Sequence, residues 1–567
     1  MIRLLGLARR HLGWLAPLSV LGLIGFSIAC GAIGIDFGWH WDEHYHVEGV
    51  RECVDGLTLS THRYIYGSVY FLLGLLVVAA HHVRFLPEFF LEMARKSDGA
   101  IIDLAGYDSV KRFHESAHGL LASNRYVLET RMVFFCVSSL AALWVYLTVR
   151  KLYPGRYLGA LGAAAFAALC WELHYHGRFI AVDAVMAQLM AAALYLLSGA
   201  WTSTRVPSFL GFYVGAAIVS GVLFTCKATG LVAILPVLLL PFVLPARPPL
   251  GLALGLSPGL SRRRWGLAAL AALVSATTVL VVQPGTAADF LRYVAALRRE
   301  AWEYGFVSAN NGNVVPSVVG RIAAFFAWLG LAVPSHHVVG SALLSAVVVV
   351  GVVCFVRDRP RLSVLGGVVV LVMFVMMVRH PLFFVRQYLM LIPFMALGFG
   401  AGLTALHERF GARWRWLSRS TLVVTAVVLV LNARWLHATA RSIRHDSPGR
   451  GLQDLTADLL ARPEPVRVSP SLVSDLSGPL SPRYRCRAPG PDVQAQVPIA
   501  LRASDGVWRT NKFGLASRSY GARWINFDWY PPGGAGSGPS PIYVLSPRQI
   551  RAQGIPVDKY EICEPAR

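Results

Sequence analysis

Long apolar stretches separated by short polar connections make up most of the chain. Runs of about 20 apolar residues, the length needed to cross a bilayer, recur from Leu12 to Leu431. The first run lacks a small-residue cleavage site, so we predict a retained helix and not a signal peptide. The run lengths predict about eleven membrane-spanning helices, at residues 12–34, 132–149, 157–173, 180–198, 208–225, 229–245, 266–283, 338–356, 364–378, 388–405 and 420–436.

Two polar connections are long enough to hold structure of their own. The first outer loop, residues 36–131, contains the apolar stretch 64–80. This stretch is short for a span, and we interpret it as a helix that lies on the membrane surface or re-enters it. Residues 88–125 of the same loop are rich in charge and predict an amphipathic helix and loop. The second long connection covers residues 284–337.

The composition changes near the C-terminus. Beyond about Arg441 the chain is rich in Pro, Gly, Ser and Arg, with strand-like pieces at 466–468 and 542–545 and a predicted helix at 452–460. We therefore predict a transmembrane domain of residues 1–440 and a small α/β domain of residues 441–567 outside the cytoplasm. The predicted fold class is mostly α and polytopic.

Composition agrees with a membrane protein. The chain is 55% hydrophobic with a mean hydropathy of +0.52, and only 15% of its 567 residues are charged, against about 25% in soluble domains. This composition excludes a disordered chain and disfavours a soluble enzyme.

The positive charge predicts the orientation in the membrane. The formal net charge is +22, and Lys and Arg gather in short connections between predicted spans, as in cytoplasmic loops. This places the N-terminus in the cytoplasm, with the first outer loop and the tail outside. Because topology accounts for the charge, we do not expect nucleic-acid binding. The basic clusters are Arg3/Arg9/Arg10, Arg150/Lys151/Arg156, Arg262–Arg264, Arg357/Arg359/Arg361 and Arg409/Arg413/Arg415/Arg419.

Seven of the eight cysteines fall into two groups. Those in or beside apolar runs, such as Cys170 and Cys226, are interpreted as packing residues. Cys486 and Cys563 lie in the polar tail. If the tail is outside the cytoplasm, these two cysteines could form a disulfide.

An acidic pair, Asp42 and Glu43, follows the first span. Carboxylates are costly at a membrane boundary and tend to mark chemistry, so one of them could act as a general base. The alternative is a solvated loop pair. His44 and His46 next to the pair are of a type that binds divalent metals, but no HExxH or CxxC pattern accompanies them, so a metal is not indicated.

A second polar cluster lies at the outer ends of the third and fourth spans. It contains Asp183, inside an apolar run, where an ionised carboxylate needs a partner. We predict Arg178 as that partner, and the pair could be structural or could bind substrate. The other members of this cluster are Glu172, His174 and His176.

Two cations interrupt apolar sequence at outer span ends. Lys227 follows the fifth span and Arg386 precedes the tenth. Cations at this depth suit a phosphate group, which Arg can bind through two hydrogen bonds. The alternative is that both side chains extend to the lipid headgroups.

Five short motifs, taken in order, resemble those of polytopic GT-C class glycosyltransferases, and most closely those of the protein mannosyltransferase and aminoarabinose transferase branch (family 39). Departures are the absence of prolines in the second motif, the histidines beside the acidic pair and an apparent insertion at 85–125. The motifs are Trp41–His46 (WDEHYH), Tyr66–Tyr70 (YGSVY), Arg178–Asp183 (RFIAVD), Thr225–Gly230 (TCKATG) and Arg386–Pro393 (RQYLMLIP).

The resemblance implies a GT-C-like bundle and a hexosyl- or pentosyltransferase. Its donor would be a polyprenyl-phosphate-linked sugar, transferred with inversion to an extracytoplasmic acceptor. By the same resemblance Asp42 is the base, Glu43 orients the acceptor, and Lys227 and Arg386 bind the donor phosphate. The implied substrate-binding residues are Tyr66, Arg178, Asp183, Lys227, Arg386 and Tyr388.

The alternative function is a transporter or channel whose intramembrane charges line its path. The absence of a visible inverted repeat and the placement of acidic residues at outer loops count against it. Membrane lipid is an expected partner in either case. The lack of organelle signals favours a bacterial inner membrane.

Overall fold

The structure is a computed structural model of the whole chain. The structure describes residues 2–36, 43–58, 67–85, 87–88, 91–92, 107–244, 262–302, 317–335, 338–379, 385–410, 415–446 and six short strands between Val466 and Pro565. The main helices of the membrane region are α1 (Ile2–Ile33), α6 (Asn124–Ser139), α7 (Ala141–Leu152), α8 (Tyr157–Ala168), α10 (Val182–Thr202), α11 (Val206–Phe224), α12 (Ile234–Val243), α14 (Arg262–Val282), α18 (Val338–Asp358), α19 (Pro360–Arg379), α20 (Ile392–Ala405) and α22 (Arg415–Asp446).

Further helical elements connect these helices. They are α2 (Glu43–Asp55), α3 (Ser68–His82), α5 (Asp108–Leu121), α9 (Trp171–His176), η2 (Ala228–Ala233), α15 (Gly285–Ala288), α16 (Phe290–Trp302), α17 (Val318–Ala327), η5 (Trp328–Ala332), η6 (Val385–Leu391) and η7 (Leu406–Phe410).

Nine helical stretches in the described part of the chain are long and apolar enough to cross a membrane. A segment that crosses a membrane must satisfy its backbone hydrogen bonds internally, and an α-helix does so. These nine helices therefore make the chain a polytopic integral membrane protein. They are Trp14–Ile33, Asn124–Leu152, Val182–Thr202, Val206–Phe224, Arg262–Val282, Val338–Asp358, Pro360–Arg379, Arg386–Glu408 and Ser418–Arg441.

Every predicted span coincides with an apolar helix, but the span predicted at 157–173 is too long, because its helix runs only Tyr157–Ala168. The helix ends early because Cys170 adopts an extended conformation, after which the chain turns into α9. The helix predicted at 229–245 runs Ala228–Val243, within two residues of the prediction at each end. The apolar stretch of the first outer loop forms α3, which is also shorter than a span.

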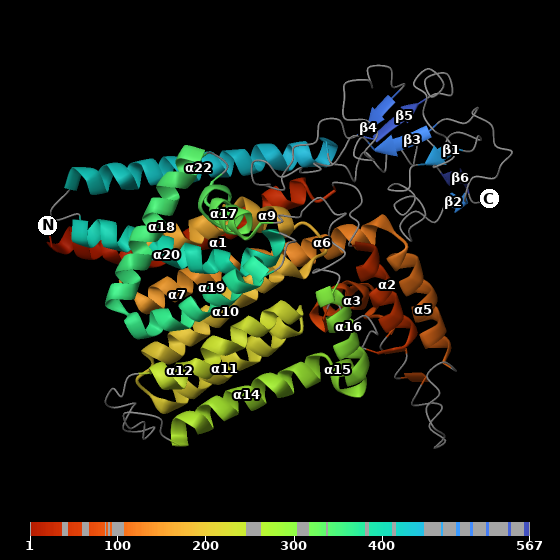
Figure 1. Ribbon diagram of the computed structural model, residues 1–567, viewed down its shortest axis with the longest axis horizontal. Helices are drawn as coiled ribbons and strands as arrows, with labels where there is room; N and C mark the ends of the chain where they lie inside the picture. The colour runs from red at the N-terminus through yellow and green to blue at the C-terminus, as the bar shows by residue number, and fades with distance from the viewer. Residues whose placement is uncertain are drawn as a thin grey trace. The chain divides into compact units, whose positions relative to one another are not determined.

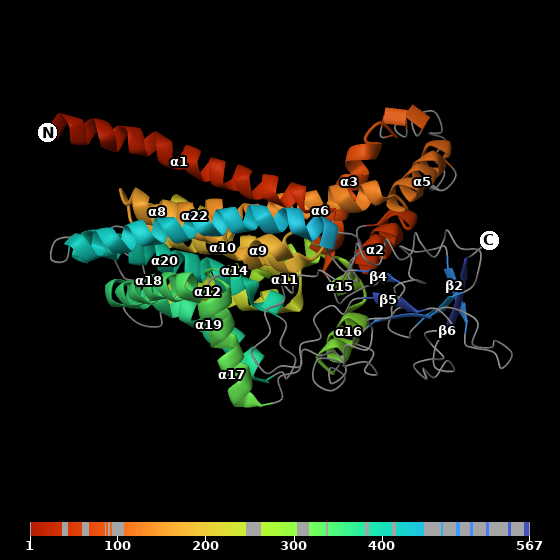
Figure 2. The same cartoon turned by 90° about the horizontal axis from the view of Figure 1, so that it is seen from above.

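The helices at the centre of the membrane region pack closely against one another. Helix α10 packs between α7 and α11, and α14 lies against α11 (Figures 1 and 2). Helices α18 and α20 approach most closely through glycines: a Cβ on Gly351 would lie 1.8 Å from the carbonyl oxygen of Gly398. Small residues at such crossings let membrane helices pack backbone to backbone.

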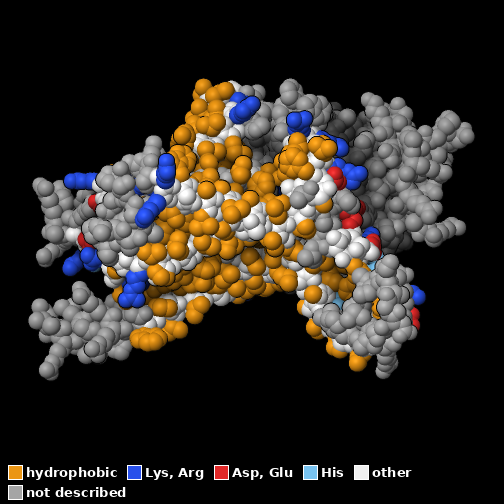
Figure 3. All heavy atoms as spheres, turned by 90° about the horizontal axis from the view of Figure 1, so that it is seen from below, with side chains coloured by type: hydrophobic (Ala, Val, Ile, Leu, Met, Phe, Trp, Pro, Cys, Tyr) orange, Lys and Arg blue, Asp and Glu red, His pale blue; other side chains and the backbone are white. Residues whose placement is uncertain are grey.

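The outer faces of these helices are apolar. Figure 3 shows a broad hydrophobic band on one face, with Lys and Arg side chains gathered at its edges. Helix α14 exposes Leu273 and Val281, and α18 exposes Val339 and Val353. Exposed apolar surface on this scale is the surface expected to face lipid.

Arginines of two predicted cytoplasmic connections bind helix ends. Arg264 donates from Nη1 to the carbonyl oxygens of Phe242 at 3.1 Å and Leu244 at 3.3 Å, at the end of α12. Arg359 donates from Nη2 to the carbonyl oxygen of Leu152 at 2.6 Å, at the end of α7. Both satisfy carbonyls that a helix leaves unpaired at its C-terminus.

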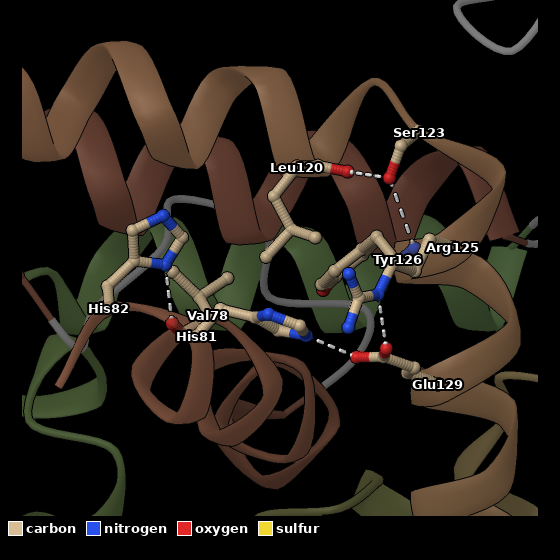
Figure 4. A network of polar contacts seen from close by, with 8 residues as sticks. All are labelled: Val78, His81, His82, Leu120, Ser123, Arg125, Tyr126 and Glu129. Atoms are coloured by element: carbon tan, nitrogen blue, oxygen red, sulfur yellow. Dashed lines mark hydrogen bonds and ion pairs between the residues drawn. The ribbon is translucent and has the colours of Figure 1, made fainter.

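In the first outer loop, polar contacts join α3 and α6 (Figure 4). His81 on α3 donates from Nε2 to the carboxylate of Glu129 on α6, which also accepts a hydrogen bond from Arg125 Nε at 2.7 Å. Ser123 caps α6 by accepting from the backbone N–H of Tyr126 at 3.3 Å. Two helices that flank the amphipathic segment are thereby held together.

The amphipathic segment predicted at 88–125 contains α5, which polar contacts attach to its neighbours. His82 of α3 lies 3.0 Å from Ser116 Oγ, and His118 lies 2.8 Å from Asp55 at the end of α2. The carboxylate of Glu92 accepts from the first backbone N–H groups of α5 at 3.0 Å. Helix α5 is therefore attached to α2, to α3 and to Glu92 by polar contacts.

The tail contains a six-stranded sheet of order β2-β6-β1-β3-β5-β4. Strands β1 and β3 pair in parallel and the other neighbours are antiparallel. The predicted strands at 466–468 and 542–545 are β1 and β5, and the predicted helix at 452–460 lies outside the described residues. The strands are β1 (Val466–Val468), β2 (Tyr484–Arg487), β3 (Ile499–Arg502), β4 (Arg518–Tyr520), β5 (Ile542–Leu545) and β6 (Glu561–Pro565).

The chain divides into two compact units. The first comprises residues 1–31, 49–436 and 529–534, and holds the membrane helices. The second comprises residues 32–48, 437–528 and 535–567, and holds the sheet. The predicted domain boundary at residue 440 falls inside α22.

Candidate functional site

A buried ion pair joins two of the predicted substrate-binding residues. Lys227 Nζ lies 3.6 Å from Asp183 Oδ1, and the two side chains are only 6% and 4% exposed. Asp183 stands in the first turn of α10, where the helix dipole favours a carboxylate. Lys227 has an extended backbone between α11 and η2. Each charge compensates the other in a place where neither is hydrated.

The predicted pairing of Asp183 with Arg178 is wrong. Arg178 donates from Nη2 to the carbonyl oxygen of Cys30 on α1 at 3.3 Å and to His174 Nδ1 at 3.0 Å. Lys227 takes its place because α10 and α11 form an antiparallel pair, which brings the end of α11 to the start of α10.

The second and fourth sequence motifs meet at this ion pair. The backbone N–H of Gly67 donates to the carbonyl oxygen of Cys226 at 3.1 Å, and that of Val69 to Thr225 at 3.4 Å. A Cβ on Gly67 would lie 1.7 Å from the Thr225 oxygen. The first outer loop therefore contacts the backbone directly before Lys227, at a distance that only glycine permits.

Arg178 and His174 form a buried polar contact beneath α1. Arg178 is 1% exposed, and burial lowers its pKa to about 10, which leaves it protonated at neutral pH. Burial and, secondly, the charge of Arg178 hold the pKa of His174 well below its ordinary value. A neutral His174 accepts from Arg178 at Nδ1 and donates from Nε2 to the carbonyl oxygen of Ser27 at 3.2 Å.

Short helix α9 carries two further buried ionisable groups. Glu172 Oε2 lies 3.4 Å from His176 Nε2, and their side chains are 1% and 7% exposed. Trp171 at the start of α9 packs edge-on against Trp435 of α22, with ring centroids 4.6 Å apart. The stretch from Glu172 to Asp183 is thus a polar layer enclosed by apolar helices.

Arg386 and Tyr388 lie on η6, which packs against both α9 and α10. The ring of Tyr388 is buried against Phe325 and Trp328, with centroids 5.9 and 6.3 Å apart. Arg386 is partly exposed. The element that carries Arg386 therefore borders the helices that carry the polar layer.

Several predicted residues are not placed at this site. Asp42 and Tyr66 lie outside the described residues, as does the side chain of His44. Glu43 and His46 are fully buried in the second compact unit. Within the described ranges, no group of three or more His, Cys, Asp or Glu side chains has the arrangement of a metal site.

Arg131 is a buried charge that the sequence prediction overlooked. It lies on α6 and is 1% exposed. The predicted span starts at residue 132 because the residues before it are polar, whereas the helix begins at Asn124. An arginine directly before an apolar run was the available signal.

No protein-family model and no curated protein sequence matches the chain. Among solved structures, ArnT from Cupriavidus metallidurans in the apo state is similar with a TM-score of 0.47 and 14% identity, over 82% of this chain and 84% of that one. ArnT bound to undecaprenyl phosphate gives 0.45 and 15%, over 83% and 84%. The oligosaccharyltransferase of Archaeoglobus fulgidus in the apo form gives 0.41 and 12%, over 78% and 58%.

His46 should make stability depend on pH. Burial lowers its pKa to about 3, below the value of about 6.5 in an unfolded chain. The folded state therefore resists protonation, and stability falls as pH drops below 6.5. Between pH 7 and pH 5 we expect a loss of about 2 kcal/mol from this group. Unfolding of the purified protein and of His46→Gln at both pH values checks this; an equal pH dependence in both would contradict it.

Proposed function

We propose that the chain is a membrane glycosyltransferase that moves a sugar from a polyprenyl-phosphate donor to an extracytoplasmic acceptor with inversion. The observation that supports it best is the meeting of three motif segments at Lys227. Asp183 pairs with its ammonium group, and Gly67 binds the backbone just before it. A buried cation held by two other segments is suited to recognising a phosphate.

In this proposal Lys227 and Arg386 bind the phosphate of the donor. The phosphate is the leaving group and gains negative charge as the bond to the anomeric carbon breaks, so fixed cations stabilise the transition state. Asp183 would neutralise Lys227 before the donor binds, which lowers the cost of holding an empty cation in a buried place. Arg178 would act by holding the α9 segment against α1, and Tyr388 would fix η6 through its packing against Phe325 and Trp328.

The acidic pair would supply the other half of the reaction. Asp42 would accept the proton of the acceptor hydroxyl as its oxygen attacks the anomeric carbon from the face opposite the phosphate, and Glu43 would orient the acceptor. The bond to the phosphate breaks as the new glycosidic bond forms, which inverts the configuration. The positive-inside distribution supports a cytoplasmic N-terminus and an extracytoplasmic site.

The test is transfer by the purified protein in nanodiscs, with a polyprenyl-phosphate-linked sugar and a mixture of candidate acceptors. Asp42→Asn should reduce transfer by about 10³-fold or more, since it removes the base, while thermal unfolding stays unchanged. Full turnover by the variant would remove Asp42 from this role. Solute flux in proteoliposomes without consumption of the donor would favour the transporter instead.

A further inference from the structure

We propose that Cys486 and Cys563 form a disulfide bond that links β2 to β6, and that the sheet consequently folds outside the cytoplasm. The strand register carries this inference. In the antiparallel pair of β2 and β6, Cys486 and Cys563 are direct partners. Partners in antiparallel strands have Cα atoms about 4.5–5.5 Å apart, and disulfides span about 4.4–6.8 Å between Cα atoms.

Neighbouring positions in the same pair agree with this register. Arg485 lies opposite Glu564, so the adjacent pair joins opposite charges, which stabilises cross-strand partners. A slip of one residue would separate the two cysteines and also the two charges. The same register therefore pairs the two cysteines with each other and the two opposite charges with each other.

No other cysteine competes within the tail. Cys486 and Cys563 are the only cysteines after residue 441. The other six of the chain are free thiols, and Cys30, Cys53, Cys170 and Cys226 are buried. The remaining two, Cys136 and Cys354, lie in α6 and α18. A pairing of the two tail cysteines thus leaves the membrane region fully reduced.

The position of the link gives it a structural purpose. Strand β2 stands at the edge of the sheet and has β6 as its one neighbour in the strand order. An edge strand is held to its sheet by hydrogen bonds on one side only. A covalent bond between β2 and β6 closes the chain between two distant segments and restricts the unfolded state.

The reaction requires an oxidant and a compartment. Two thiols lose two protons and two electrons to form the bond, and the electrons pass to the disulfide of a thiol–disulfide oxidoreductase, which becomes a dithiol. Such oxidants maintain disulfides outside the cytoplasm, whereas cytosolic thiols stay reduced. The pairing therefore places the sheet on the side that the distribution of Lys and Arg predicts for the tail.

The experiment counts thiols in the full chain. Cells are treated at harvest with a membrane-permeant maleimide, which stays in excess while the protein is denatured so that the buried thiols also react. The protein is then purified without reductant and examined by mass spectrometry. We expect six labelled cysteines before reduction, all eight after it, and a linked peptide containing Cys486 and Cys563. Eight labelled thiols before reduction, or either tail cysteine linked to a different one, would overturn the proposal.

Matched variants separate the link from other effects. Cys563→Ser should leave Cys486 labelled before reduction, and Cys486→Ser should do the same for Cys563. The control Cys354→Ser should keep the linked peptide. Expression in cells that lack the extracytoplasmic oxidoreductase should abolish the link; its persistence there would contradict the assigned compartment. Because labelling reports on thiols alone, a negative result leaves the transfer reaction to be judged separately.

Discussion

Replacing Lys227 with Met should abolish transfer and destabilise the protein. The substitution leaves Asp183 as an unpaired carboxylate at 4% exposure. Breaking a buried pair by removing one partner costs about 3–5 kcal/mol, which should appear as a large fall in the unfolding midpoint in detergent. Loss of the phosphate contact should reduce transfer by at least about 10²-fold.

A second variant separates the two effects of that change. In the double variant Asp183→Asn/Lys227→Met both charges are gone, so stability should largely return while transfer stays lost. Recovery of transfer in the double variant would show that Lys227 is structural only. Lys111→Met is the matched control: its ammonium is 62% exposed and lies 3.7 Å from the exposed Asp108. We expect that control to change stability by less than about 1 kcal/mol.

Gly67→Ala should separate the first outer loop from the segment before Lys227. The new methyl would lie 1.7 Å from the backbone oxygen of Thr225, and backbone yields less readily than a flexible side chain. The hydrogen bond from Gly67 to Cys226 at 3.1 Å would be lost. We expect a destabilisation of about 3 kcal/mol and a fall in transfer of at least tenfold, measured by unfolding and by turnover in nanodiscs.

The control for that change is Gly119→Ala. A Cβ on Gly119 meets nothing within 4 Å, and its position inside α5 should gain up to about 1 kcal/mol from helix propensity. Both glycines lie in the first outer loop, so expression effects on the loop are matched. Equal behaviour of the two variants would contradict the importance of the Gly67 contact.

Hydropathy was sufficient to find the membrane helices. Span length and apolarity are properties of a local segment, so the run that became α18 could be recognised from its own residues. The same holds for β5, whose four residues are all of the β-branched, aromatic or aliphatic types typical of strands. The length of α8 was overestimated, because the sequence of an apolar segment does not show whether the helix continues or ends in a buried turn.

The partner of Asp183 could not be found in this way. Arg178 is its nearest cation along the chain, and sequence separation was the only available measure of distance. The true partner, Lys227, arrives through the antiparallel packing of α10 and α11. The contact of Gly67 with Thr225 likewise depends on how a loop folds back onto a helix end, which composition does not reveal.

The arginines that bind helix ends affect how membrane orientation can be tested. Reversing the charge of Arg264 would leave the terminal carbonyls of α12 facing a carboxylate, and the same change at Arg359 would disturb α7. A change of membrane orientation after either substitution would then have two causes, the lost positive charge of the connection and the weakened packing of the helices. Arg262 and Arg361 are exposed in the same two connections, so charge reversal there reports on orientation with far less damage to the fold.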